Sequence, residues 1–110
     1  MNINAVSNTM NFGALYPDGQ IGKLAKPVRK MIAKTLQDKD VRQLAKSYDI
    51  HLRCNNSQAM VIDVLDLQRK DGMRSAKIIS DITTATKEGL KKTIKFLADY
   101  NSTVKSINVR

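Results

Sequence analysis

The chain has one histidine and one cysteine, and they lie three residues apart in His51-Leu52-Arg53-Cys54. An imidazole beside a thiol could supply a nucleophile and its base, or half of a zinc site. Apolar and polar residues alternate here, which indicates a strand, and residues three apart in a strand point to opposite faces. We therefore expect Cys54 in the core and His51 at the surface, and we predict neither a catalytic pair nor a metal site.

Asp63 is the one acid inside the apolar run from Met60 to Leu65. A carboxylate with a perturbed pKa in a pocket is one explanation. A bulge that turns it outward, or a position at the uncovered end of a sheet, is the explanation we favour. No second carboxylate, serine–histidine pair or glycine-rich phosphate loop accompanies Asp63, so the sequence favours a binding protein without a cofactor over an enzyme.

Two rows of lysines recur at the three- and four-residue spacing of a helix face. Glu88 is the one acid within either row. Lysines on one face can each neutralise a phosphate, so both rows are predicted to contact nucleic acid, either RNA or the backbone of a duplex. The alternative is that they are the solvated faces of amphipathic helices. The first lysine row is Lys23, Lys26, Lys30 and Lys34, with Arg29 beside it, and the second is Lys87, Lys91 and Lys95, with Lys92 beside it.

Composition limits the number of domains, the class of partner and the location of the protein. A chain of 110 residues with 42% hydrophobic residues has room for one small domain. Its formal charge of +9 and isoelectric point of about 9.9 favour a polyanionic partner, such as nucleic acid, and do not determine the fold. No apolar run approaches the length of a membrane span. A single cysteine favours a reducing, cytoplasmic location.

The sequence divides into three parts. Residues 1–20 contain no lysine or arginine and are predicted to be a flexible arm that ends in the turn Tyr16-Pro17-Asp18-Gly19. An alternative location follows from this arm, because an uncharged N-terminus could direct export by a specialised secretion system. Residues 21–102 form the predicted domain, and residues 103–110 are a tail or a short extra strand.

The period of the apolar residues predicts an α+β fold of the order ααβββα. Helices are expected over residues 27–37 and 40–48, and strands over residues 50–54, 59–68 and 73–83. A last helix, capped by Thr84 or Thr86, ends near residues 100–102 and packs on one face of the antiparallel meander.

Two turns set the predicted register of the meander. Asp71-Gly72 indicates a two-residue turn that pairs Val61 with Ile82, and the earlier turn places Cys54 opposite Ala59. This register leaves an apolar outer face that needs cover from the first helix, the N-terminal arm or another chain. The competing function is therefore a protein-interaction or oligomerisation domain, such as a homodimer, that acts through this face. Its residues are Met60, Ile62, Val64 and Ile79.

The order of a helix, a three-stranded meander and a helix, over roughly residues 40–100, is similar to that of double-stranded RNA-binding domains. The stretch Lys91-Lys92-Thr93-Ile94-Lys95 resembles their Lys-Lys-x-Ala-Lys cluster. That family places its cluster at the start of the last helix and a Gly-Pro-x-His loop between its first two strands. Here the lysines lie in mid-helix and the loop is Asn55-Asn56-Ser57-Gln58, so the resemblance is one of element order.

Overall fold

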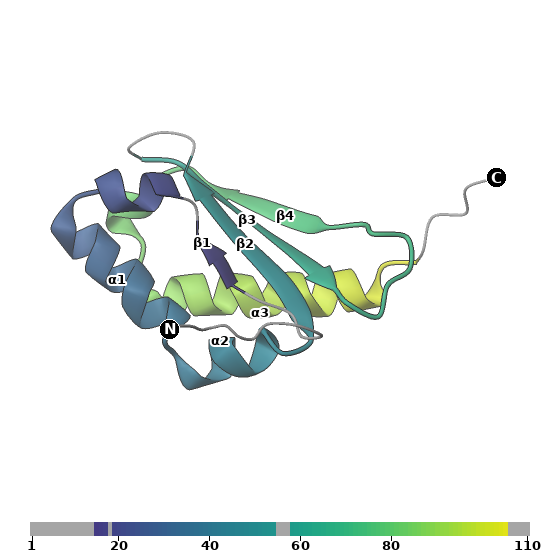
Figure 1. The fold of residues 1–110 in the computed structure, drawn as a ribbon. Coiled ribbons are helices and arrows are strands. Elements are labelled where there is room, and N and C mark those ends of the chain that lie inside the picture. Colours follow the sequence, from purple (N-terminus) through teal and green to yellow (C-terminus); the bar gives the residue numbers. More distant parts are fainter. Residues whose placement is uncertain (1–14, 18, 55–57, 106–110) are drawn as a thin grey trace.

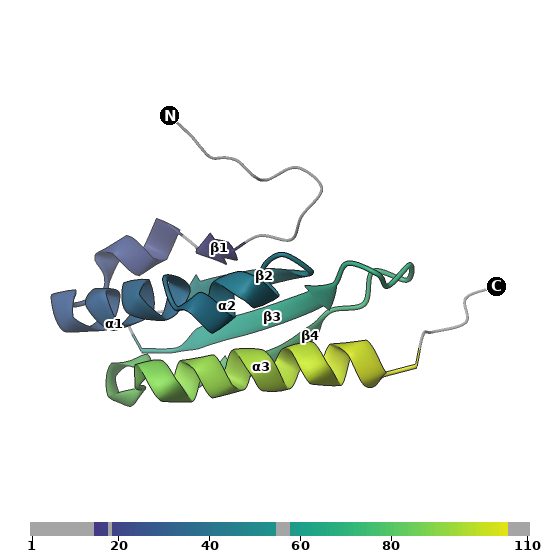
Figure 2. The ribbon, with the colours of Figure 1, turned by 90° about the horizontal axis from the view of Figure 1, so that it is seen from below.

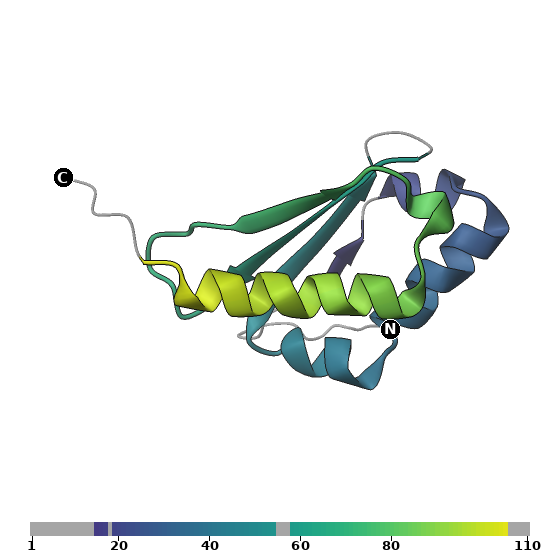
Figure 3. The same cartoon turned by 180° about the vertical axis from the view of Figure 1, so that it is seen from behind.

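The computed structural model describes residues 15–17, 19–54 and 58–105, and it confirms the α+β fold. Three helices lie on one side of a sheet, with α3 along β3 and β4 (Figure 1). Figure 3 shows α3 running the length of the sheet. The elements in chain order are β1 (Leu15–Pro17), the 3-10 helix η2 (Gly19–Lys23), α1 (Lys26–Leu36), α2 (Lys39–Leu44), β2 (Tyr48–Cys54), β3 (Met60–Asp66), β4 (Ser75–Ile79), the 3-10 turn η3 (Ile82–Thr84) and α3 (Lys87–Thr103).

The sheet has the order β1-β2-β3-β4, and its last three strands form the predicted antiparallel meander. The strand β1 was not expected. The prediction that Tyr16 and Pro17 lie in a turn is wrong, because both belong to β1, which pairs in parallel with Ile50–Leu52 of β2. Proline has no N–H to donate, and an edge strand tolerates that loss. Residues 1–14 and 106–110 lie outside the described residues, so the rest of the arm and the extra C-terminal strand stay predictions.

The predicted pairing of β2 with β3 is wrong by one residue. Cys54 lies opposite Met60, not Ala59, and this slip exchanges the two faces of β3. Met60, Ile62 and Val64 are fully buried beneath the helices, and each buried side chain of this size stabilises the fold by about 1.5–3 kcal/mol. The predicted register would instead have placed the charge of Asp63 in the core, which explains why the observed register is favoured.

The pairing of β3 with β4 also differs from the prediction. Val61 lies opposite Ile78, not Ile82, because the connection at Asp71-Gly72 is wider than a two-residue turn. Gly72 adopts a φ of +70°, as predicted for this position, but the loop is held by other contacts. Ile82 leaves the sheet and is buried in η3.

Asn101 of α3 fixes this wide connection. Its side chain is fully buried, accepts a hydrogen bond from Asp66 N at 2.7 Å and donates to Met73 O and Ser75 Oγ, each at 2.9 Å. Arg69 pairs with Asp71 at 2.6 Å and donates to the carbonyl of Asn101 at 2.7 Å. The end of α3 therefore binds a backbone group at each end of the connection, Asp66 N and Met73 O, and the connection does not close as a tight hairpin.

Candidate nucleic-acid interface

Helix α1 turns the first lysine row outward. Val28, Ile32 and Thr35 are buried against the core, Met31 and Leu36 are partly buried beside them, and the lysine face of the helix points to solvent. Pro27 occupies the first turn, where its missing N–H costs nothing. Within the part of the chain that the structure describes, the row makes no ion pair. Its members Lys23, Lys26, Lys30 and Lys34 are all exposed.

Arg29, unlike the lysines beside it, makes a hydrogen bond to the backbone. Its Nε donates a hydrogen bond to Leu24 O at 3.0 Å, which ties the guanidinium to the entry of α1. The side chain is exposed, so the remaining N–H groups still face solvent. Arg29 therefore contributes positive charge to this surface from a fixed position.

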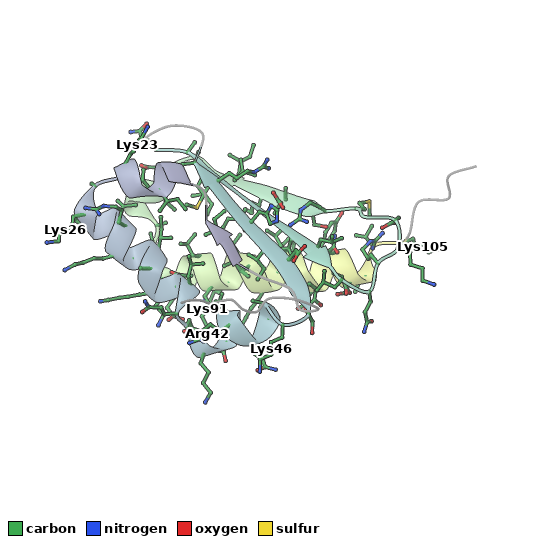
Figure 4. All side chains as sticks on the ribbon, in the orientation of Figure 1. Lys23, Lys26, Arg42, Lys46, Lys91 and Lys105 are labelled. Carbon is green, nitrogen blue, oxygen red and sulfur yellow. The ribbon has the colours of Figure 1, made fainter. Side chains whose placement is uncertain are left out.

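Helix α2 extends the positive surface with three cations that the sequence analysis missed. Lys39 and Arg42 of α2 and Lys46 of the turn after it are exposed and recur at three- and four-residue spacing. Together with Gln37 and Gln43 they line a shallow hollow of about 310 Å³. Figure 4 labels Lys23, Lys26, Arg42 and Lys46, which project from η2, α1, α2 and the turn after α2 toward the outside of the molecule. The three- and four-residue spacing of these cations is visible in the sequence and is the signal that could have found them.

The second lysine row lies against those two aspartates. Lys91 Nζ is 3.2 Å from Asp38 Oδ2 and 3.1 Å from Asp40 Oδ2. Lys87 Nζ is 3.2 Å from Asp38 Oδ2, and Lys95 Nζ is 3.4 Å from Asp40 Oδ2. The three lysines join α3 to the start of α2, so the prediction that they form a second open phosphate-binding row is not supported by their position.

Asp38 has a double role at this contact. Its Oδ1 accepts hydrogen bonds from Asp40 N at 2.8 Å and Val41 N at 3.4 Å, which caps α2. Burial would raise the pKa of Asp38, but hydrogen bonds from Lys91, the Asp40 amide and Lys87 outweigh burial and hold that pKa well below its usual range.

Two further members of the contact, Asp40 and Lys91, also stay charged. The hydrogen bond and the positive charge of Lys91, followed by those of Lys95, lower the pKa of Asp40. Hydrogen bonds to Asp40 and Asp38 raise the pKa of Lys91, against the effect of burial. The contact is therefore ionic at neutral pH.

Lys92 lies outside this contact. It is exposed, and the described ranges contain no ion pair for it. The Lys-Lys-x-x-Lys stretch that resembles RNA-binding domains is thus split, because Lys91 and Lys95 bind aspartates and Lys92 faces solvent.

Asp63 does not face the core that the helices cover. It lies on the outer face of the sheet, where its side chain is 7% exposed. Arg53 NH2 is 3.0 Å from Asp63 Oδ2, and Arg74 Nε donates to Oδ1. His51 Nδ1 is 4.0 Å from the same Oδ1. A carboxylate so fully paired with arginines is a structural anion, and this pairing is the reason for its low exposure.

His51 shares this outer face, and Cys54 is buried in the core, as predicted. Burial and, next, the charge of Arg74 lower the pKa of His51, while Asp63 acts in the opposite direction. Among the described residues, no group of three His, Cys, Asp or Glu side chains could hold a metal ion. The same residues contain no helix long and apolar enough to cross a membrane.

The predicted apolar interaction patch is not on the surface. Met60, Ile62 and Val64 are fully buried, and Ile79 is partly buried against the same core. The cover is intramolecular, which was the alternative to another chain, and it consists of the helices. The prediction that these residues face outward is wrong because it rests on the one-residue error in register.

Comparison with protein-family models, curated proteins and solved structures finds no match for this chain.

Proposed function

We propose that this protein is a binding module that contacts the phosphate backbone of nucleic acid through the α1–α2 cationic surface. The surface lies on η2, α1 and α2, and no acid occurs in the sequence between Gly19 and Gln37. It consists of Lys23, Lys26, Arg29, Lys30, Lys34, Lys39, Arg42 and Lys46.

One observation carries the proposal. The acids nearest to this surface, Asp38 and Asp40, are bound by the second lysine row, so they do not neutralise the cations of α1 and α2. Solvated helix faces commonly mix both signs of charge. A surface of one sign, whose nearest acids are held by another helix, favours a polyanion over water alone as its neighbour.

The arrangement suits backbone contact better than base readout. Lysines four residues apart on α1 are separated by about 6 Å along the helix axis, a distance comparable to the spacing of successive phosphates. Lysine is a flexible point charge and does not impose the bidentate geometry by which arginine reads guanine. We therefore expect binding that depends strongly on salt and weakly on sequence.

The test is a titration of labelled RNA and DNA duplexes of the same sequence, followed by fluorescence anisotropy at several salt concentrations. We expect log K to fall linearly with log salt, with a slope of about −0.9 for each phosphate contact on DNA. The triple variant Lys26→Gln, Lys30→Gln and Lys34→Gln should reduce the slope by about 2–3 units, because three contacts are lost.

The matched control is the triple variant Lys70→Gln, Lys92→Gln and Lys105→Gln. It removes the same charge from exposed lysines outside the α1–α2 cationic surface. The control should change the slope much less than the α1 variant. Equal losses in the two variants, or no binding at low salt, would contradict the proposal.

A further inference from the structure

The exposed apolar side chains of this protein are not scattered evenly. Among the described residues, the large apolar side chains that face solvent are Leu67, Ile78, Phe96 and Tyr100, which are 39%, 65%, 59% and 52% exposed. The rings of Phe96 and Tyr100 stack on each other, with centroids 6.0 Å apart and planes at 17°. A stacked aromatic pair in water is a usual component of a protein interface.

Phe96 and Tyr100 lie on the β4 side of α3. Lys91 and Tyr100 are nine residues apart, which is two and a half helical turns, so they point to opposite sides of α3. Lys91 faces α2. Figure 2 shows α3 next to the β4 margin of the sheet and α2 over β2, toward the β1 margin. The aromatic pair and Ile78 of β4 therefore border the same edge of the molecule.

That edge is an unpaired strand. β4 hydrogen-bonds to β3 on one side, and no described strand lies on its other side. The free N–H and C=O groups of an edge strand form a template for another strand. Edge strands are commonly protected by charges, and within Ser75–Ile79 the one charged residue is Lys77. The opposite edge is the three-residue strand β1, which ends in a proline.

The charges around this edge differ from those of the α1–α2 cationic surface. Lys77 of β4 and Lys92, one turn before Phe96 on α3, are accompanied by Asp81, which follows β4, and none of these three side chains has an ion pair within the described ranges. A region that carries both signs of charge does not attract a polyanion. It is self-complementary, because a two-fold axis brings the same residues together and lets cations of one copy face acids of the other.

We infer that β4 is the interface of a homodimer in which two copies of this chain pair their β4 strands antiparallel across a two-fold axis. The sheet then continues from one copy into the next. Ile78 of both copies meets on the outer face, and Phe96 and Tyr100 cover the joint on the helix side. The α1–α2 cationic surfaces lie away from the joint, so their mutual repulsion does not oppose it strongly.

The inference is tested by the mass of the protein in solution, and it does not depend on nucleic-acid binding. Sedimentation velocity or light scattering from about 1 to 500 μM should show a transition from 12.3 kDa to twice that mass. Hydrogen exchange should slow at the β4 amides as the concentration rises, because those amides become paired.

Two variants and one control make the test specific. Ile78→Lys places like charges opposite each other at the axis, and Phe96→Ser removes the apolar cover, so each should weaken dimerisation at least about tenfold. Leu67→Lys makes the same kind of change at an exposed apolar residue in the loop after β3 and should leave the dimer intact. Circular dichroism verifies that all three remain folded. A monomer at every concentration, or equal weakening by Leu67→Lys, would overturn the inference.

Discussion

The two lysine rows have the same spacing in the sequence and different surroundings in the structure. Lys26, Lys30 and Lys34 extend from α1 into solvent, whereas the second row binds Asp38 and Asp40. Spacing on one helix determines which side chains point together. What those side chains meet is determined by the neighbouring element, and here that element lies about fifty residues earlier in the chain.

The second lysine row also helps to hold α2, which carries part of the α1–α2 cationic surface. Helix α2 has six residues and is too short to be stable alone. It is held by buried Val41, by the Asp38 cap and by the ionic contact with α3. This docking presents Lys39 and the other α2 cations on the outside of the molecule. The second lysine row thus supports the α1–α2 cationic surface without belonging to it.

Of the changes that test the difference between the two lysine rows, substitution of Asp38 should have the largest effect. Asp38→Ala loses both the cap of α2 and the partner of Lys87 and Lys91, so we expect Tm to fall on the order of 5 °C. Asp38→Asn keeps an acceptor for the cap and loses only the charge, so its Tm should fall less. Thermal unfolding followed by circular dichroism measures both. Equal Tm values for wild type and Asp38→Ala would show that the contact does not hold α2.

The Tm values of wild type and Asp38→Asn should converge at acid pH. The ordinary pKa of the Asp38 carboxyl is 3.8, and it is lower in the folded protein, so the unfolded chain binds protons first as the pH falls. The stabilisation by the ionised carboxylate is complete above about pH 5 and is lost progressively at lower pH. The Tm difference between wild type and Asp38→Asn should therefore be constant near neutrality and shrink toward about pH 3.

The sequence was sufficient for the elements but not for the contacts between them. The period of the apolar residues located the helices and the three main strands, since burial of one face imposes that period. Thr86 was one of two candidates for the cap of α3, and it accepts a hydrogen bond from Gly89 N. These signals are local, because each lies within one element or its cap.

The errors concerned contacts between different elements. The register of β2 and β3 depended on whether Asp63 could remain in the core, and the arginines that pair with it, Arg53 and Arg74, come from both neighbouring strands. Greater weight on the cost of a buried charge would have indicated the observed register. The pairing of Lys91 with Asp38 had no comparable signal, because nothing in either helix specifies how the two helices pack.

Release of the second lysine row from Asp38 and Asp40 should have an effect of intermediate size, which is a change in the salt dependence of binding. The double variant Asp38→Asn and Asp40→Asn frees up to three lysines on α3, and each new phosphate contact should steepen the salt dependence by about 0.9 units. We therefore expect the anisotropy titration on a DNA duplex to give a steeper slope than wild type, despite a lower Tm. An unchanged slope in a folded double variant would mean that ion pairing is not what separates the two rows.

The smallest expected effect comes from one lysine in each row. Lys30→Gln removes a charge that faces solvent, so Tm should change by no more than about 1 °C, and the salt slope should fall by about 0.9 units. Lys91→Gln leaves Asp38 and Asp40 with weaker partners, so Tm should fall by about 2–3 °C while the slope stays the same. The two substitutions are chemically identical and remove the same charge, so net charge cannot explain opposite results. A row that binds should affect the slope alone, and a row that docks a helix should affect Tm alone.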